Sequence, residues 1–218
     1  MLIFRQKIMK KIIVVIVKYK FKIAVIGDQF VGKTSLLYKY LNKDELVKAT
    51  IGNTYEIKIT SFDGKKVTIN FIDTSGQDKF KAITKSIFHE ADGFIIVFDL
   101  NNEISFDNIL YWFYEIKNTI DIHDTEILMI GNKNDLERKV SLERIHNFEK
   151  INNLGIEYLF HETSAKTGDG IDESIQILIE KLIKHYENNK KNNKTKPKNI
   201  KLGQNDKNSE KKNEGECC

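Results

Sequence analysis

The sequence predicts an α/β fold in which a mostly parallel sheet is flanked by helices. Between residues 21 and 186, short apolar runs alternate with segments of helical periodicity, a pattern typical of parallel strands joined by helices. Polar and glycine-rich motifs follow several of the apolar runs. Because ligands of such sheets bind beyond the carboxyl ends of the strands, the positions of these motifs support the same fold class.

Short apolar runs mark the predicted strands. The first ends at Gly27, and the second and third are joined through Asp63-Gly64, a dipeptide favoured in tight hairpin turns. These two strands are therefore expected to form a hairpin. In chain order the predicted strands are Phe21–Ile26, Tyr55–Ser61, Lys66–Ile72, Phe94–Asp99, Glu126–Ile130 and Glu157–Phe160.

Helical segments separate these strands, and the last of them is amphipathic. Trp112, within an aromatic run, is expected to pack in the core. The five histidines lack the spacing of metal ligands, so we interpret them as surface or packing residues. In chain order the predicted helices are Thr34–Leu41, Ser105–Thr119, a segment near Ser141–Ile151, and Ile171–Tyr186.

Composition excludes several classes of protein. The chain has 218 residues and two cysteines, both at its C-terminus, which excludes a disulfide scaffold and a cysteine-based zinc site within the domain. Residues 1–20 carry 6 basic and 0 acidic side chains, residues 187–218 carry 9 and 5, and the part between them is net acidic. An acidic body argues against nucleic acid as a partner, whereas basic ends suit an anionic membrane surface.

A phosphate-binding motif follows the first predicted strand. Gly27-Asp28-Gln29-Phe30-Val31-Gly32-Lys33-Thr34 fits G-x-x-x-x-G-K-[ST] and opens a helix, the context that the motif requires. The backbone of such a loop wraps around phosphate oxygens, Lys33 reaches the β- and γ-phosphates, and Thr34 binds Mg²⁺. A glycine-rich turn without function is the alternative. The expected nucleotide contacts are Gly27, Phe30, Val31, Gly32, Lys33, Thr34 and Ser35.

A second pair of motifs predicts guanine as the base. Asn132-Lys133-Asn134-Asp135 follows the fifth strand, and Asp135 can accept hydrogen bonds from both N1–H and the 2-amino group of guanine. The stem of Lys133 would lie along the base. After the sixth strand, Ser164-Ala165-Lys166 would place the Ala165 N–H against guanine O6. A P-loop kinase or ATPase is the alternative, and Asp135 and Ala165 argue against it.

With these motifs the chain resembles the Ras superfamily of small GTPases and, within it, the Rab family, from about Tyr19 to Tyr186 and again in the last two residues. Asp73-Thr74-Ser75-Gly76-Gln77 is similar to the family's D-T-A-G-Q, with Ser75 replacing alanine. The resemblance implies the P-loop small GTPase fold with a six-stranded sheet, GTP/GDP and Mg²⁺ as ligands, and hydrolysis of GTP to GDP and phosphate.

The resemblance also implies roles for residues of the two switch segments. Asp73 would hold Mg²⁺ through water, the Gly76 N–H would sense the γ-phosphate, and Gln77 would orient the attacking water as the catalytic residue. Thr50, within Ala49-Thr50-Ile51-Gly52, would bind Mg²⁺ and contact the γ-phosphate only in the GTP state. The expected metal ligands are thus Thr34, Thr50 and Asp73.

The first switch departs from the Rab pattern. Asn53-Thr54-Tyr55 follows Ile51-Gly52 where Rab proteins carry x-D-F, and Ile72 stands where they usually have tryptophan. The segment between Lys33 and Thr50 is shorter than usual, and its loop carries Leu46 and Val47 in place of the aromatic residues that cover the nucleotide in the family. We expect looser nucleotide retention. A GTPase outside the Rab family and a nucleotide-bound scaffold that does not cycle are the alternatives.

A slow switch with protein partners is the expected function. The three arginines, Arg5, Arg138 and Arg144, are not placed by the sequence beside the γ-phosphate, so intrinsic turnover on the order of 10⁻⁴ to 10⁻² s⁻¹ is expected. An exchange factor, a GTPase-activating protein and effectors would read the switch loops. Prenyl-escort and GDP-dissociation-inhibitor type proteins are further expected partners. The protein is expected to be a monomer and to bind no nucleic acid.

The two ends of the chain lie outside the predicted GTPase domain, residues 19–186. Residues 187–218 are expected to be a disordered tail, and the terminal Cys217-Cys218 resembles the Rab double-geranylgeranylation site. This predicts attachment to the cytosolic face of intracellular membranes, cycling with the cytosol, in vesicle traffic. Residues 1–18 form an N-terminal extension that is an artefact of the gene model or irregular, an amphipathic element, or a signal peptide.

Overall fold

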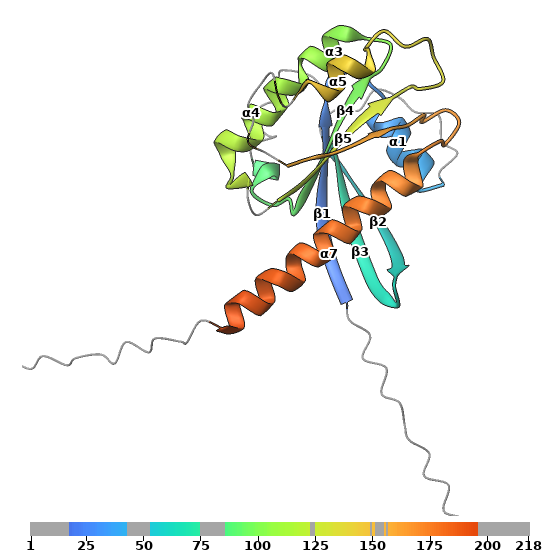
Figure 1. Ribbon diagram of the computed structural model, residues 1–218. Helices are drawn as coiled ribbons and strands as arrows, with labels where there is room; N and C mark the ends of the chain where they lie inside the picture. Colours follow the sequence, from blue (N-terminus) through green and yellow to red (C-terminus); the bar gives the residue numbers. More distant parts are fainter. Residues whose placement is uncertain are drawn as a thin grey trace, which may run out of the picture.

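A six-stranded sheet forms the centre of the molecule, with strand order β2-β3-β1-β4-β5-β6 (Figure 1). The computed structural model describes residues 18–42, 53–74, 86–122, 125–148, 150, 155 and 157–195. β2 pairs with β3 antiparallel and the remaining neighbours are parallel, so the predicted fold class is confirmed. The strands are β1 Lys18–Gly27, β2 Asn53–Phe62, β3 Lys65–Thr74, β4 Gly93–Asp99, β5 Glu126–Asn132 and β6 Leu159–Glu162.

The predicted helices form, and several of their bounds differ from the prediction. The segment predicted at Ser105–Thr119 is two helices that meet at Asn108, and the Asn102 side chain accepts the Ile104 N–H to cap the first of them. Ser141 likewise caps the next helix, which ends at His146, and Phe148 and Lys150 are helical again after a turn at Asn147. The helices are α1 Lys33–Tyr40, α3 Glu103–Asp107, α4 Ile109–Thr119, α5 Leu142–His146 and α7 Ile171–Thr195.

Two apolar clusters cover the two faces of the sheet, and β1 contributes to both. Phe21, Ile23 and Val25 pack with α1 and α7 on one face. Ala24 and Ile26 pack with α3, α4 and α5 on the other. Each large apolar side chain buried in this way contributes about 1.5–3 kcal/mol. Burial on both faces explains why the central strands are continuous apolar runs in the sequence.

Helix α7 extends beyond its predicted end. The composition predicts a disordered tail from Glu187, but the helix continues through Thr195, so this expectation is wrong for residues 187–195. Tertiary contacts hold the first residue of the extended part, because Glu187 Oε1 accepts hydrogen bonds from the Tyr19 hydroxyl at 2.6 Å and from Lys65 Nζ at 2.9 Å. The Tyr186 ring also packs edge-on against the Tyr19 ring. The folded domain therefore extends past Tyr186.

The start of β1 and the C-terminal half of α7 meet on one side of the domain. β1 begins at Lys18, one residue before the Tyr19–Glu187 contact, and Figure 1 shows the start of β1 beside the lower half of α7. The expectations for residues 1–17 and for 196–218, including Cys217 and Cys218, lie outside the described residues. Among the helices that the structure describes, none combines the length and apolar character needed to cross a bilayer.

We expect Tyr19→Phe to lower the free energy of unfolding by about 1 kcal/mol at neutral pH, because it removes the hydrogen bond to Glu187 and keeps the ring. Burial, then the hydrogen bond and charge of Glu187, raise the pKa of Tyr19 from 10.0 to about 12. The hydroxyl therefore stabilises the fold below pH 10, and this contribution is lost as the pH rises toward 12.

Urea denaturation of both proteins between neutral pH and pH 12 measures this contribution. The advantage of the unmodified protein over Tyr19→Phe should shrink above pH 10. A difference that stays constant across this range would contradict a role for the Tyr19 proton.

Candidate nucleotide-binding site

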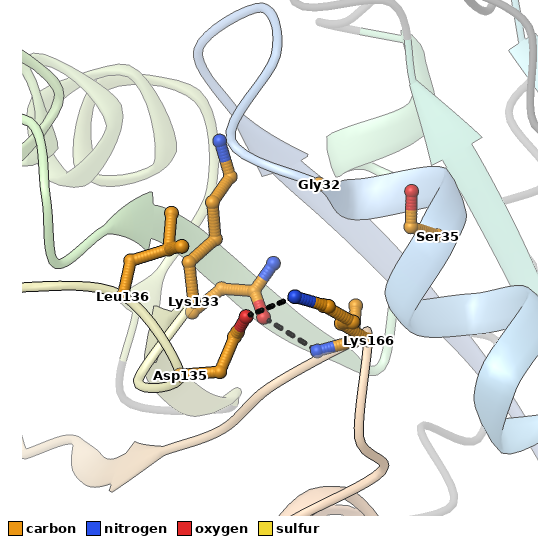
Figure 2. A pocket seen from close by; sticks show the side chains of 8 residues that line it. Gly32, Ser35, Lys133, Asp135, Leu136 and Lys166 are labelled. Atoms are coloured by element: carbon orange, nitrogen blue, oxygen red, sulfur yellow. Dashed lines mark hydrogen bonds and ion pairs between the residues drawn. The ribbon is translucent and has the colours of Figure 1, made fainter.

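A pocket of about 300 Å³ lies beyond the carboxyl ends of the strands (Figure 2). Three segments line it: the start of α1, the loop after β5 and the loop after β6. Figure 2 shows Lys133 and Asp135 of the middle segment facing Gly32, which precedes α1, and Ser35 within it, with Lys166 on the third side. The three motifs, which the sequence separates by about 100 and about 30 residues, therefore meet at one cavity. Its lining residues are Gly32, Ser35, Asn132, Lys133, Asp135, Leu136, Ala165 and Lys166.

Two glycines allow the phosphate loop to form. Gly27 has a φ of +135°, and a Cβ there would lie 2.2 Å from the carbonyl oxygen of Val97 in β4. Gly32 has a φ of +100° and begins α1 at its N-cap. The first backbone N–H groups of a helix form an electropositive end that favours anions. The phosphate loop ends at this part of α1, which is therefore suited to bind phosphate.

Lys33 turns back over the phosphate loop. Its Nζ donates to the carbonyl oxygens of Gly27 at 3.0 Å and Asp28 at 2.7 Å, and its side chain is almost fully buried. Burial lowers the pKa of Lys33 from 10.5 to about 8, while the carboxylates of Asp73 and Asp28 act in the opposite direction. Two main-chain oxygens of the loop thus hold the Lys33 ammonium group in place.

Other predicted residues of this loop contribute through the backbone. Phe30 has a φ of +65° and a side chain that is 74% exposed, so it does not line the pocket. Val31 is buried, and its carbonyl oxygen accepts a hydrogen bond from Asn132 Nδ2 at 2.8 Å.

Thr34 and Asp73 form a pair of oxygen donors suited to Mg²⁺. The Thr34 hydroxyl donates to Asp73 Oδ2 at 2.5 Å, and Asp73 is buried at the end of β3. Thr74 fixes this strand end, because its hydroxyl donates to the carbonyl oxygen of Val25 in β1. A hydroxyl and a carboxylate are ligands that Mg²⁺ prefers, so these residues fit the expected ion. Thr50, Gly76 and Gln77 lie outside the described residues.

Asn132 joins the three segments of the site. Its Nδ2 donates to Val31 O of the phosphate loop, and its Oδ1 accepts the Ala165 N–H at 3.0 Å from the loop after β6. Thr163 adds a longer hydroxyl contact to the same oxygen. An O6 contact by the Ala165 N–H, as the sequence leads us to expect, would therefore be shared with Asn132. The bridging role of Asn132 follows only from the structure.

Asp135 is held with its carboxylate toward the pocket. Ser164 donates to its Oδ1 at 2.6 Å, and Lys166 Nζ lies 3.5 Å from its Oδ2. The hydrogen bond from Ser164 lowers the pKa of Asp135 below its usual range. The group is therefore an anionic acceptor at neutral pH, as recognition of two guanine donors requires.

Asp99, a residue that the sequence analysis did not single out, orients Lys133. Lys133 has a φ of +66°, and its Nζ lies 2.7 Å from Asp99 Oδ2 at the end of β4. Asp99 occupies the carboxyl end of a strand, which is the signal that could have identified it. Two of the arginines are engaged elsewhere, since Arg138 pairs with Glu162 and Arg144 with Asp107.

The fold and this site define a P-loop GTPase, in which a glycine-rich loop meets a guanine-type loop at the end of a mostly parallel sheet. The Ras family model matches residues 22–184. The chain is 34% identical over 201 residues to Ras-related protein Rab-13 of Rattus norvegicus, a match that covers 90% of this chain and 95% of that protein.

Two further relatives agree. Identity to Ras-related protein Rab-11C of Dictyostelium discoideum is 36%, with 74% of this chain and 72% of the relative covered. Identity to Ras-related protein Rab-8B of Homo sapiens is 37%, with 76% and 79% covered. The chain belongs to the Ras family of small GTPases and, within it, to the Rab family. It binds GTP, GDP and Mg²⁺ and hydrolyses GTP, which confirms the class predicted from the motifs.

Proposed function

We propose that this protein is a membrane-attached Rab switch that directs vesicle traffic and hydrolyses GTP slowly without a partner. The observation that carries the proposal is the bridge made by Asn132, which locks the phosphate loop and the guanine-type loop into one site. Family membership supports the general role in membrane transport. Its particular regulators and effectors are proposed by class only: an exchange factor, a GTPase-activating protein and effectors that read the switch loops.

Binding and charge neutralisation are the main tasks of this site. Lys33 and the N-terminal end of α1 neutralise the negative charge that spreads over the phosphates during transfer. Thr34, Thr50 and Asp73 would hold Mg²⁺, which supplies further charge stabilisation when bound. Gln77 orients the attacking water. Arg138 and Arg144 are occupied by acidic side chains, which supports a slow intrinsic rate and a stimulating partner.

GTP hydrolysis acts on partner proteins through a change in the conformation of the switch segments. Thr50 and Gly76 hold the two switch segments while the γ-phosphate is present and release them after hydrolysis. A ligand can shift such an equilibrium only through contacts that differ between the states, and the γ-phosphate is the group that differs between GTP and GDP.

Gln77→Leu should trap the GTP form. The leucine side chain cannot donate to or accept from the attacking water, so hydrolysis should fall about 10²–10⁴-fold. GTP binding should stay unchanged, because Gln77 acts on the water. Single-turnover hydrolysis of preloaded GTP, with and without an activating protein, measures the effect. Undiminished stimulated hydrolysis in Gln77→Leu would argue against the role proposed for Gln77.

Membrane attachment is proposed to come from lipids on Cys217 and Cys218. The two cysteines are adjacent and resemble a double-geranylgeranylation site, and two lipid chains anchor stably where one is marginal. A prenyl-escort protein would present the chain for modification, and a GDP-dissociation inhibitor would extract it from the cytosolic face of the membrane. The basic residues of the tail add attraction to anionic lipid.

Replacing both cysteines by serine should move the protein from the membrane fraction to the supernatant, because about 0.8 kcal/mol is lost for each CH₂ that no longer enters the bilayer. Fractionation of eukaryotic cells expressing each form measures this. Single substitutions serve as controls and should retain partial binding. A doubly substituted protein that sediments with membranes as before would contradict lipidation of this pair.

A further inference from the structure

Asp28, the second residue of the phosphate loop, joins this loop to helix α4. Asn108 Nδ2 donates to Asp28 Oδ2 at 2.6 Å, and Trp112 Nε1 donates to Asp28 Oδ1 at 3.1 Å. Each oxygen of one carboxylate thus receives its own donor from the helix. We propose that Asn108 and Trp112 are positioning residues that hold the phosphate loop in its nucleotide-binding form and slow nucleotide release. The proposal rests on the nucleotide site described above.

The two donors differ in their surroundings: Trp112 is buried, whereas Asn108 is exposed. Trp112 is 7% exposed and belongs to the apolar cluster on the α3–α5 face of the sheet, so its indole N–H has a fixed position. Asn108 lies at the junction of α3 and α4, at the N-cap of α4. Residues 109–111, the first turn of α4, are apolar or aromatic, and a carboxylate is favoured at this end of a helix. Asp28 supplies that charge from another part of the chain.

Asp28 also contacts the residue expected to bind the phosphates. Its carbonyl oxygen accepts a hydrogen bond from Lys33 Nζ at 2.7 Å, while its carboxylate is bound by Asn108 and Trp112. The main chain and the side chain of one residue therefore connect the ammonium group to α4. If the side-chain contacts are removed, the carbonyl that orients Lys33 is no longer fixed, and the loop samples conformations that hold phosphate less well.

The same carboxylate requires a partner for electrostatic reasons. Asp28 lies in a loop that receives a highly charged anion, and an unpaired carboxylate there would repel the phosphates. The indole and amide donors direct the carboxylate toward α4 and stabilise its charge. Both the geometry and the charge of the loop thus depend on α4.

The test is the rate of GDP release from the full chain. Trp112→Phe keeps an aromatic ring in the cluster and removes the donor, and Asn108→Ala removes the other. Each should speed the release of a fluorescent GDP analogue about tenfold, the value expected for loss of one hydrogen bond to a charged group. Asn118→Ala, an exposed position on the same helix, is the matched control and should leave the rate unchanged.

A cycle with Asp28→Ala distinguishes positioning from a general loss of packing. In the Asp28→Ala background, Trp112→Phe should cause no further acceleration, because the shared contact is already absent. GDP release within twofold of the unmodified protein in both Trp112→Phe and Asn108→Ala, even with a lowered unfolding temperature, would overturn the proposal. Equal acceleration by Trp112→Phe with and without Asp28 would overturn it as well. A chain unable to bind guanine nucleotide at all would instead refute the function itself.

Discussion

Asp135→Asn is expected to weaken GDP binding by about 10²–10⁴-fold, since two hydrogen bonds to a charged acceptor contribute about 1.5–3 kcal/mol each. An asparagine has one oxygen and one NH₂ group, so it cannot accept from both N1–H and the 2-amino group of guanine. The site is built for an anion, because Ser164 donates to Asp135 Oδ1 and lowers the pKa of the group. The loss should appear at every pH near neutrality.

Competition between nucleotides gives the prediction a second readout. Xanthosine diphosphate carries an oxygen where guanosine diphosphate carries the 2-amino group, and the amide NH₂ that Asp135→Asn introduces could donate to that oxygen. Asp135→Asn should therefore recover part of its affinity with xanthosine diphosphate.

Asp63→Asn supplies the control for this experiment. It makes the same chemical change at an exposed residue of the turn between β2 and β3, which does not line the pocket, so it should leave the preference for GDP unaltered. Displacement titrations with both diphosphates measure the ratio. An Asp135→Asn protein that still prefers GDP with undiminished affinity would show that the base is read elsewhere.

Gly32→Ala is expected to weaken nucleotide binding by about 10²–10³-fold through a single added methyl group. Its Cβ would lie 2.3 Å from Asn132 Nδ2, the atom that donates to Val31 O. The bridge must break or the loop must move, which costs about 1–3 kcal/mol, and the φ of +100° adds about 1–2 kcal/mol of backbone strain. In the free protein the phosphate loop can relax to avoid this cost. Nucleotide binding restores the strained form of the loop, so most of the cost appears as lost affinity.

Gly64→Ala separates backbone strain from the clash. Gly64 has a φ of +70° in the turn between β2 and β3, and no described atom lies within 4 Å of its ideal Cβ position. The substitution should lower the free energy of unfolding by about 1 kcal/mol and leave nucleotide affinity unchanged. Calorimetric titration with GDP compares the two proteins. Similar losses of affinity in both would contradict the role of the Asn132 bridge.

Local patterns predicted the strands and loops well, because these depend on neighbouring residues. The Asp63-Gly64 turn is confirmed, with φ values of +47° and +70° and a ladder that closes at Phe62 and Lys65. The apolar runs became strands because both faces of the sheet are covered. The nucleotide motifs converge because the carboxyl ends of parallel strands share one edge.

Contacts between distant residues could not be predicted in the same way. The end of α7 depends on Glu187 meeting Tyr19 and Lys65, whereas the local composition of lysine and asparagine favours disorder. Asp28 and Trp112 are 84 positions apart, and no local pattern relates them. A single sequence shows which residues can form such contacts, but not which of them will meet in the folded protein.

The Tyr19–Glu187 contact lies at the opposite end of β1 from the nucleotide site. A pull on α7 from its C-terminal end would first reach the sheet at Tyr19 and Lys65, through their hydrogen bonds to Glu187. The phosphate loop begins at Gly27, eight residues and about 26 Å farther along the same strand. A domain held through the proposed lipid attachment would thus carry load at one end of its central strand and its nucleotide at the other.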